Sequence, residues 1–207
     1  MRYGMVIDLF KCMGCHACVV ACRAEHGTPP GVLYNRVEQM DVGRYPNARP
    51  VFAPMACRHC QDPDCVKACP TEASYQRDDG IVLVDPDKCI GCQACVPACP
   101  YGARSLVREL NCYYPGQSPT PYEQNVTRRH EPGKVEKCDF CHSRVEQGKR
   151  PACVDTCPAQ ARYFGDLDDP DSPPSRQLSL HEAVKEAAEP DARLSLIYIR
   201  SREECGR

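Results

Sequence analysis

The sequence predicts a loop-rich protein of the α+β class, built around a repeated pattern of cysteines. Cysteine accounts for 18 of the 207 residues, and sixteen of these fall into four groups with a common outline. Proline is also frequent, with 20 residues, and it interrupts helices and central strands. The apolar runs between the cysteine groups are short, as at residues 3–9 and 80–85. Short elements joined by many loops are therefore expected.

The first and third cysteine groups are copies of one pattern. Residues 8–22 read DLFKCMGCHACVVAC and residues 85–99 read DPDKCIGCQACVPAC, so the four cysteines, the glycine and both alanines coincide. The second group, residues 57–70, and the fourth, residues 138–158, widen the middle gap to four and eleven residues. Each group begins with C-x2-C and ends with C-x3-C, and three of the four end in Cys-Pro. An internal repeat of this kind sets the architecture of the chain.

Four thiols at this spacing are typical of iron–sulfur ligands. In C-x2-C-x2-C, three cysteines wrap one loop around three corners of a [4Fe-4S] cube, and the fourth, further along the chain, binds a neighbouring cluster. Groups of this type therefore work in pairs. Small residues such as Gly14 and Gly91 let the loop approach the cluster closely and donate backbone N–H groups to sulfur.

Zinc and disulfides are the alternative roles for these cysteines. Structural zinc often takes a C-x2-C pair and a distant pair, which fits the second and fourth groups but not the first and third, whose four cysteines lie within eleven residues. Disulfide frameworks belong to secreted chains, and residues 1–12 contain no apolar segment or cleavage site of a signal peptide. Cys112 and Cys205 stand outside the four groups. They are expected to be ordinary thiols rather than spare ligands or redox switches.

Charge and hydropathy exclude several classes of partner. The net charge is −2, which does not indicate a nucleic acid partner. No uncharged apolar run approaches the length of about 20 residues that spans a bilayer. No transmembrane segment is therefore predicted.

The first part of the chain outside the groups contains short predicted elements. Residues 3–9 and 80–85 are expected to be strands, the second opened by the turn residues Asp79 and Gly80. Short helices are expected after each Cys-Pro. Residues 111–136 form a Pro-rich insertion without periodicity, and a loop of that length is usually functional or disordered.

Three elements are predicted in the tail. Residues 165–176 are expected to be a turn-rich linker, because they contain three prolines and four aspartates. A short helix is expected over residues 179–189, with Ser179 as its N-cap. Residues 193–200 alternate in the manner of a strand.

Several polar residues near the groups have two alternative roles. Histidines lie inside three groups: His16, His59 and His142. Because every group already has four thiols, these histidines are not expected to bind metal. They are expected either to donate a hydrogen bond to cluster sulfur or to have no role at the cluster. A lysine precedes the first cysteine of three groups, Lys11, Lys88 and Lys137, either as a cation that raises a cluster's potential or as a solvated side chain. The insertion carries a basic stretch, either a subunit contact or a solvated loop: Arg128, Arg129, His130 and Lys134.

As a set, the four groups resemble the iron–sulfur subunits of the molybdopterin oxidoreductases. The spacings x2-x2-x3, x2-x4-x3, x2-x2-x3 and x2-x11-x3 are similar to those of the four-cluster electron-transfer subunit of dimethyl sulfoxide reductase and of the arsenate, polysulfide and tetrathionate reductases. The resemblance covers residues 1 to about 170. Residues 164–172, FGDLDDPDS, also look like the segment after the last motif in the arsenate reductase and phenylacetyl-CoA oxidoreductase branches. One departure is Arg23, which follows Cys22 where the family pattern has proline; it implies a small change in loop path.

The resemblance implies four [4Fe-4S] clusters and the ligands of each. The first group pairs with the fourth and the second with the third, and the last cysteine of each group binds the cluster of its partner group. The implied thiol sets are set 1 (Cys12, Cys15, Cys18 and Cys157), set 2 (Cys138, Cys141, Cys153 and Cys22), set 3 (Cys57, Cys60, Cys65 and Cys99) and set 4 (Cys89, Cys92, Cys95 and Cys69).

The same resemblance implies a domain organisation and a function. Residues 51–108 are expected to form a two-cluster ferredoxin-like unit, inserted between residues 1–50 and 109–165, which form a second such unit. Residues 166–207 are expected to be a C-terminal extension that docks a partner. The clusters would lie in a line and relay single electrons between a molybdenum or tungsten bis-pterin catalytic subunit and a membrane quinone-linked subunit or another redox partner. The chain itself is then not catalytic.

Two other classes of function remain as alternatives. One is a free-standing polyferredoxin that shuttles electrons between soluble enzymes. The other is a zinc-stabilised binding module, which would show neither colour nor a reduction-dependent EPR signal. The predicted location is the cytoplasm, or the periplasmic side after export together with a signal-bearing catalytic subunit.

Overall fold

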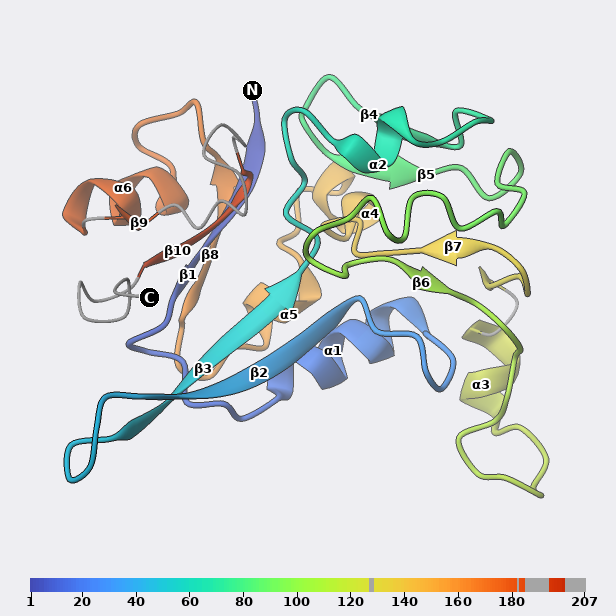
Figure 1. The fold of residues 1–207 in the computed structure, drawn as a ribbon, viewed down its shortest axis with the longest axis horizontal. Coiled ribbons are helices and arrows are strands. Elements are labelled where there is room, and N and C mark those ends of the chain that lie inside the picture. Colours follow the sequence, from blue (N-terminus) through green and yellow to red (C-terminus); the bar gives the residue numbers. More distant parts are fainter. Residues whose placement is uncertain (127–128, 182, 185–193, 200–207) are drawn as a thin grey trace.

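A small mixed sheet lies at one side of the molecule, and the short strand pairs that follow the cysteine groups lie at the other (Figure 1). The computed structural model describes residues 1–126, 129–181, 183–184 and 194–199. The sheet has the strand order β8-β1-β10-β9 and consists of β1 (Tyr3–Asp8), β8 (Arg162–Asp166), β9 (Ala183–Val184) and β10 (Leu196–Ile199). Strand β1 is antiparallel to β8 and parallel to β10. Its central place explains its continuous run of buried residues.

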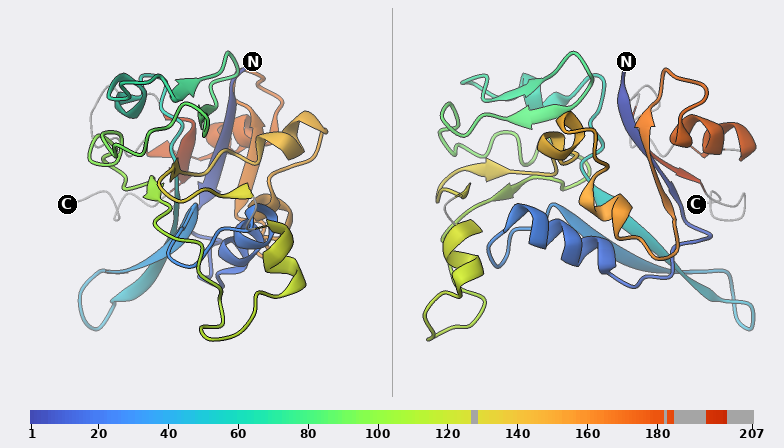
Figure 2. Two further views of the ribbon diagram at one scale, coloured as in Figure 1. Left: turned by 90° about the vertical axis from the view of Figure 1, so that its right-hand side faces the viewer. Right: turned by 180° about the vertical axis from the view of Figure 1, so that it is seen from behind.

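Three antiparallel pairs complete the β structure of the described residues. They are β2 (Asn35–Val42) with β3 (Arg49–Ala56), β4 (Ser74–Gln76) with β5 (Val82–Val84), and β6 (Ser105–Leu106) with β7 (Val135–Glu136). The β2–β3 ribbon projects from the body, and helix α1 (Ala17–His26) lies along it, as the view from behind shows (Figure 2). The other helices are α2 (Asp64–Lys67), α3 (Pro121–Val126), α4 (His142–Glu146), α5 (Ala152–Asp155) and α6 (Pro173–Leu180). The prediction of a loop-rich mixture of short helices and strands is confirmed.

Two strand pairs bring distant cysteine groups to the same place. Strand β1 leads into the first group and β8 leaves the fourth, and in their antiparallel register Ile7 lies opposite Arg162. In the same way β4 leaves the second group and β5 leads into the third, with Ser74 opposite Val84. The first group therefore lies beside the end of the fourth, and the end of the second beside the start of the third.

The apolar core is divided between these two regions. The larger cluster of buried side chains surrounds the sheet and includes Met5, Ile7, Phe140, Leu196 and Tyr198. A smaller cluster lies between the second and third groups, and its buried members are Ala73, Cys89, Cys95 and Val135. Two of those four are cysteines, so thiols make up half of the buried members of this smaller cluster.

The prediction of short helices after each Cys-Pro is wrong. At those places the chain turns, because the third residue after the cysteine has a left-handed φ: 54° at Glu72, 55° at Gly102 and 48° at Gln160. The turn sends the chain directly into β4, β6 or β8. The short helices α2 and α5 instead precede the last cysteine of their groups, where they contain Cys65 and Cys153.

In the tail, the structure corrects the predicted linker and confirms the predicted strand. Helix α6 begins at Pro173, inside the segment expected to be a linker. Proline is compatible with the first turn of a helix, and the Ser172 hydroxyl caps it by accepting a hydrogen bond from the Ser175 backbone N–H at 3.4 Å. Ser179 lies in the last turn of α6 rather than at an N-cap. The helix predicted over 179–189 is wrong at Ala183–Val184, which form strand β9, and most of its other residues fall outside the described residues. Strand β10 confirms the strand predicted at 193–200.

Candidate metal centres

The loops that carry the cysteines share one backbone conformation. The third residue of every C-x2-C is left-handed: Gly14 (φ 69°), His59 (44°), Gly91 (69°) and Phe140 (54°). Glycine suits this conformation, and at Gly91 a Cβ atom would lie only 2.0 Å from the carbonyl oxygen of Gly133. His59 and Phe140 instead stack on each other, with ring centroids 3.8 Å apart. The second and fourth groups are thus in contact through these two rings.

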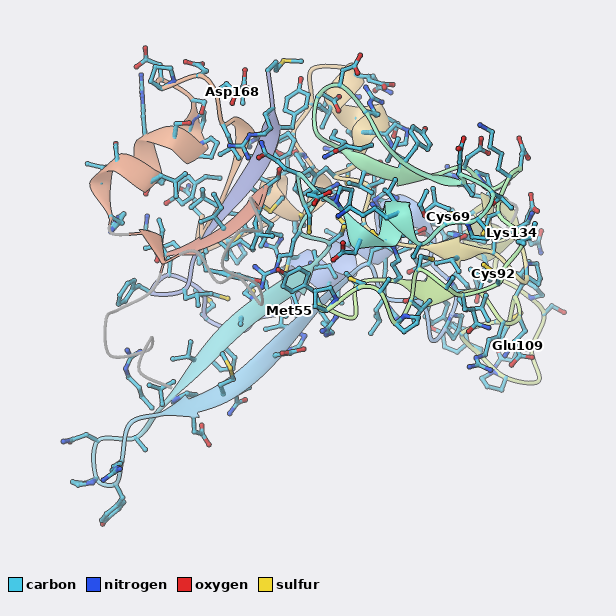
Figure 3. The ribbon with its side chains drawn as sticks, turned by 45° about the horizontal axis from the view of Figure 1, so that its top comes forward. Met55, Cys69, Cys92, Glu109, Lys134 and Asp168 are labelled. Atoms are coloured by element: carbon cyan, nitrogen blue, oxygen red, sulfur yellow. The ribbon has the colours of Figure 1, made fainter. Side chains whose placement is uncertain are left out.

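Two cavities are each lined by four thiols. One is lined by Cys12, Cys15, Cys18 and Cys157, and the other by Cys69, Cys89, Cys92 and Cys95. These are the cysteines that the resemblance assigns to sets 1 and 4. Cys69 and Cys92 lie near Lys134 at one end of the molecule, far from Asp168 (Figure 3).

The thiols of sets 2 and 3 are close enough to influence one another's charge. Burial raises the pKa of the Cys60 thiol to about 12, and its neighbours Cys57, Cys65 and Cys99 contribute to this rise. Burial also raises the pKa of Cys22, and the next contributions come from Cys153 and Cys141. The neighbours of Cys60 are the three other members of set 3. The two cysteine neighbours of Cys22 are both members of set 2. Sets 2 and 3 adjoin each other, because Cys57 lies among the groups that raise the pKa of Cys138.

The separation of the thiols distinguishes a cluster from a single metal ion. A tetrahedral zinc ion with Zn–S bonds of about 2.3 Å holds its sulfurs about 3.8 Å apart. Within the described chain, the one group of three ligating side chains whose donor atoms all lie within 4.8 Å of one another is His26, Asp139 and Cys141. No three thiols there are that close. Four thiols that line a common cavity at wider spacing fit a [4Fe-4S] cube, which takes four cysteine ligands.

Three residues beside the thiols were not predicted from the sequence. The His26 Nε2 atom lies 3.3 Å from the Cys141 sulfur. Arg104 donates to the Cys65 sulfur at 2.9 Å, and Arg162 to the Cys153 sulfur at 3.4 Å. The signal for the arginines was present, since both follow the alanine in Cys-Pro-x-x-Ala-Arg. His26 has no such signal, because it reaches Cys141 only through the packing of α1 against the fourth group.

The histidines of the groups have different surroundings. His59 is fully buried, and its Nδ1 accepts a hydrogen bond from the Val82 backbone N–H at 3.0 Å. Its Nε2 therefore carries the proton in the neutral ring, and within the described chain this buried atom has no hydrogen-bond partner. His142 Nδ1 lies 2.8 Å from Asp139, and His16 is exposed. Of the three, His59 has the free buried donor that a cluster sulfur would satisfy.

One of the three lysines is a buried cation. Lys137 is 5% exposed and donates to the carbonyl oxygens of Val82 and Cys138. Lys11 and Lys88 are about half exposed and lie near Asp8 and Asp85, respectively. The surroundings of Lys137 fit the role of a cation beside a cluster, and those of the other two fit solvated side chains.

The basic stretch of the insertion is attached to the body of the protein. Arg129 donates to the Glu25 carbonyl oxygen at 3.2 Å, and Lys134 donates to the carbonyl oxygens of Pro86 and Cys89. His130 is buried, with Nδ1 2.9 Å from Glu136 and Nε2 2.9 Å from the His26 carbonyl oxygen. Arg128 lies outside the described residues. These contacts attach the insertion to the body of the protein, and Arg129 itself remains exposed.

The pair of His130 and Glu136 predicts a pH-dependent stability. Burial is the largest single influence and opposes a charged imidazole, but the hydrogen bond to Glu136, its negative charge and the backbone carbonyl oxygens of His26 and Gly27 together outweigh it, and the pKa of His130 is raised from its ordinary 6.5. Stability from a raised pKa is complete below the unfolded-state value of about 6.5 and is lost as pH rises through the folded-state value. We expect the thermal unfolding midpoint to fall as the pH rises through this window. The free energy of unfolding should decrease by no more than about 1.4 kcal/mol per pH unit. A His130→Gln variant measured in parallel should lose this part of the decline; an unchanged decline would contradict the assignment.

Comparison with known proteins identifies the type of cluster protein. Two family models, both described as "4Fe-4S dicluster domain", match this chain: one over residues 48–113 and 108–167, the other over residues 11–73. A putative iron–sulfur subunit of dimethyl sulfoxide reductase from Halobacterium salinarum is 42% identical over an alignment of 219 positions. The alignment covers 100% of this chain and 82% of that protein. The chain belongs to the iron–sulfur subunits of the dimethyl sulfoxide reductase family.

Other relatives in this family of molybdopterin oxidoreductase subunits belong to reductases of different substrates. The arsenate respiratory reductase iron–sulfur subunit ArrB of Shewanella sp. strain ANA-3 is 37% identical, and the match covers 97% of each chain. A selenate reductase subunit of Mesobacillus selenatarsenatis is 43% identical, with 83% of this chain and 63% of that protein covered. Subunits of this family carry [4Fe-4S] clusters and transfer electrons, and catalysis takes place on another subunit.

Two further features belong to the description of this iron–sulfur subunit. Among the described residues, no helix has the length and apolar character that crossing a bilayer requires. Cys112, outside the thiol sets, is a free and partly exposed thiol. Cys205 lies outside the described residues.

Proposed function

We propose that this subunit relays single electrons through four [4Fe-4S] clusters, held by thiol sets 1 to 4. The observation that carries the proposal is that each set with a lined cavity draws its fourth thiol from a distant group. Cys157 lines the cavity of Cys12, Cys15 and Cys18, and Cys69 lines that of Cys89, Cys92 and Cys95. When bound, the clusters supply one-electron redox chemistry. The chain contributes the thiolates, the surrounding donors and the exclusion of water.

The finer architecture of the proposal is two ferredoxin-like units, one inserted in the other. Residues 51–108 form the inner unit with sets 3 and 4, and residues 1–50 with 109–165 form the outer unit with sets 1 and 2. Two pairings support this division. The β1–β8 pair joins the ends of the outer unit, and the β4–β5 pair lies wholly within the inner one. Strand β10 of the remaining segment, residues 166–207, is buried beside β1, and partner docking by this segment stays a prediction.

We place the four clusters in the order of sets 1, 2, 3 and 4. Sets 1 and 2 share the outer unit, and sets 3 and 4 share the inner one. The stacked rings of His59 and Phe140 and the proximity of Cys57 to Cys138 support a contact between sets 2 and 3. Exposed thiols occur only in the two end sets among the assigned cysteines, Cys15 in set 1 and Cys92 in set 4. The ends of the relay are therefore open to partner proteins, and its middle is covered.

The partner of this proposal is a catalytic subunit that holds molybdenum or tungsten on a bis-pterin. The relatives are named as subunits of dimethyl sulfoxide, selenate and arsenate reductases, which supports assembly with a catalytic chain. The second partner is a membrane quinone-linked subunit or another electron carrier. The alternative of a free polyferredoxin has less support, because these relatives are subunits of larger enzymes.

Metal analysis of the native complex tests the proposal. We expect anaerobic affinity purification from the native host to give about sixteen irons per chain, together with about one molybdenum or tungsten on a co-purified large subunit. Sixteen irons without molybdenum or tungsten would favour the free polyferredoxin. Zinc in place of iron would contradict electron transfer altogether.

A further inference from the structure

Two buried arginines occupy the same position of the internal repeat. Arg104 follows CPYGA at the end of the third group, and Arg162 follows CPAQA at the end of the fourth. Each is 5% exposed. In the second group the corresponding residue is Ser74, so the arginine occurs once in each proposed two-cluster unit.

Arg104 lies between the thiols of sets 3 and 4. One terminal nitrogen donates to the Cys65 sulfur at 2.9 Å, and the other to the Ser74 hydroxyl oxygen at 2.7 Å. Burial opposes its charge, yet the pKa of Arg104 is raised by Cys65, Cys95 and Cys57, which belong to both sets. Its buried Nε atom has no hydrogen-bond partner within the described chain. The side chain is thus held by Ser74 with a spare donor left over.

Arg162 repeats this arrangement between sets 1 and 2. One terminal nitrogen donates to the Cys153 sulfur at 3.4 Å and to the Met5 sulfur at 3.5 Å, and the other donates to the Asn35 amide oxygen at 3.2 Å. Burial again opposes the charge, and Cys153 of set 2 and Cys18 of set 1 raise the pKa of Arg162. A neutral side chain, Asn35, takes the anchoring role that Ser74 has for Arg104.

Neither guanidinium has a carboxylate partner among the residues that the structure describes. Within the described chain no salt bridge involves Arg104 or Arg162, and the charged groups that act on them are mostly thiols. A buried, unpaired guanidinium carries a large desolvation cost. A thiolate-bound cluster is anionic, so a cluster on each side offsets that cost. Positive charge and N–H donors near cluster sulfur favour the reduced form, which carries one more negative charge.

We propose that Arg104 and Arg162 each raise the reduction potentials of the two clusters between which they lie. Arg104 acts on the clusters of sets 3 and 4, most strongly on set 3, and Arg162 acts on those of sets 1 and 2. The inference rests on the proposed cluster assignment. It makes these two arginines tuning residues that keep both clusters of a unit reducible together.

EPR-monitored redox titration of the whole complex tests this inference. In the Arg104→Gln variant we expect the equilibrium constant for one-electron reduction of the nearer cluster to fall at least tenfold. This corresponds to a reduction potential lower by about 59 mV. A smaller shift is expected in its neighbour, and none in the other two clusters. Arg162→Gln should shift the other two instead. Arg104→Lys, which keeps the charge, should restore most of the potential.

The controls separate this inference from the cluster assignment itself. Arg150→Gln removes an exposed arginine that pairs with Asp155 at 2.8 Å, and it should shift no potential. Iron content and four titrating signals in the wild type test the clusters; the pattern of shifts tests the arginines. Full iron content with unchanged potentials in both Gln variants would overturn the inference, as would equal shifts of all four clusters.

A second measurement needs no substitution. In wild-type protein labelled with ¹⁵N-arginine, pulsed EPR of the reduced clusters should detect nitrogen coupling from a guanidinium beside sulfur. Absence of that coupling from all four clusters would overturn the inference even if a Gln variant failed to assemble.

Discussion

Replacing Cys60 and Cys99 together by alanine is expected to remove one cluster, whereas replacing Cys92 and Cys99 together is expected to remove two. Cys60 and Cys99 both belong to set 3, although they come from different groups of the sequence. Cys92 belongs to set 4, although it lies in the same group as Cys99. The first double variant should therefore keep about twelve irons per chain and the second about eight.

The two double variants exchange their outcomes if each group binds its own cluster. Cys92 and Cys99 would then share one cube, and their joint loss would leave about twelve irons, while the Cys60 and Cys99 pair would leave about eight. Iron per chain in the purified complex distinguishes the two cases without any spectral assignment. Cys112→Ala is the matched control, because Cys112 belongs to no set and its loss should leave about sixteen irons.

The antiparallel pairing of β4 with β5 explains why the last cysteine of one group can bind the cluster of its partner group. The second group ends at Cys69, the chain continues through β4, returns in β5 and enters the third group at Cys89. In this register Cys69 and Cys89 lie at the same end of the hairpin and line one cavity. Cys69 therefore lines the same cavity as Cys89, although about twenty residues separate the two in sequence.

The sequence was most informative where the residue type itself requires a conformation. Gly14 and Gly91 in the third position of C-x2-C mark the left-handed turn of the loop, and the short runs at β1, β5 and β10 were recognised by their apolar pattern. The turns after Cys-Pro were missed because Glu72 and Gln160 adopt a left-handed φ without being glycine. Helix α6 replaces the predicted linker because its prolines, a residue type that breaks helix interiors, occupy its first turn.

The sequence predicts the cysteine ligands better than it predicts the residues that surround them. The spacings indicate which residues bind iron, because a loop can wrap a cube in few ways. They say nothing of the Arg104 and Arg162 contacts, which depend on where Ser74 and Asn35 lie in the folded chain. The contact between His59 and Phe140 likewise arises from the meeting of two groups about eighty residues apart.

Removal of the clusters is expected to unfold the region around sets 3 and 4 before the sheet of β1, β8 and β10. Binding of a structural metal contributes about 10–16 kcal/mol in small domains, and the whole stability of a domain is about 5–15 kcal/mol. In the smaller cluster of buried side chains near sets 3 and 4, only Ala73 and Val135 are not cysteines. The sheet instead packs Met5, Ile7, Leu196 and Tyr198, which are at most 2% exposed.

Hydrogen exchange followed by mass spectrometry, before and after anaerobic removal of iron with a chelator, measures this difference. Amides of β4, β6 and β7 should lose most of their protection, because their strands are short and two of the four buried members of their cluster are cysteines. Amides of β1 and β10 should keep a measurable part of theirs, since Ile7 and Leu196 belong to the larger cluster, most of whose buried members are not cysteines. Equal loss in both regions would show that the clusters stabilise the chain as one unit. Cys112→Ser treated in parallel excludes oxidation of the free thiol as the cause.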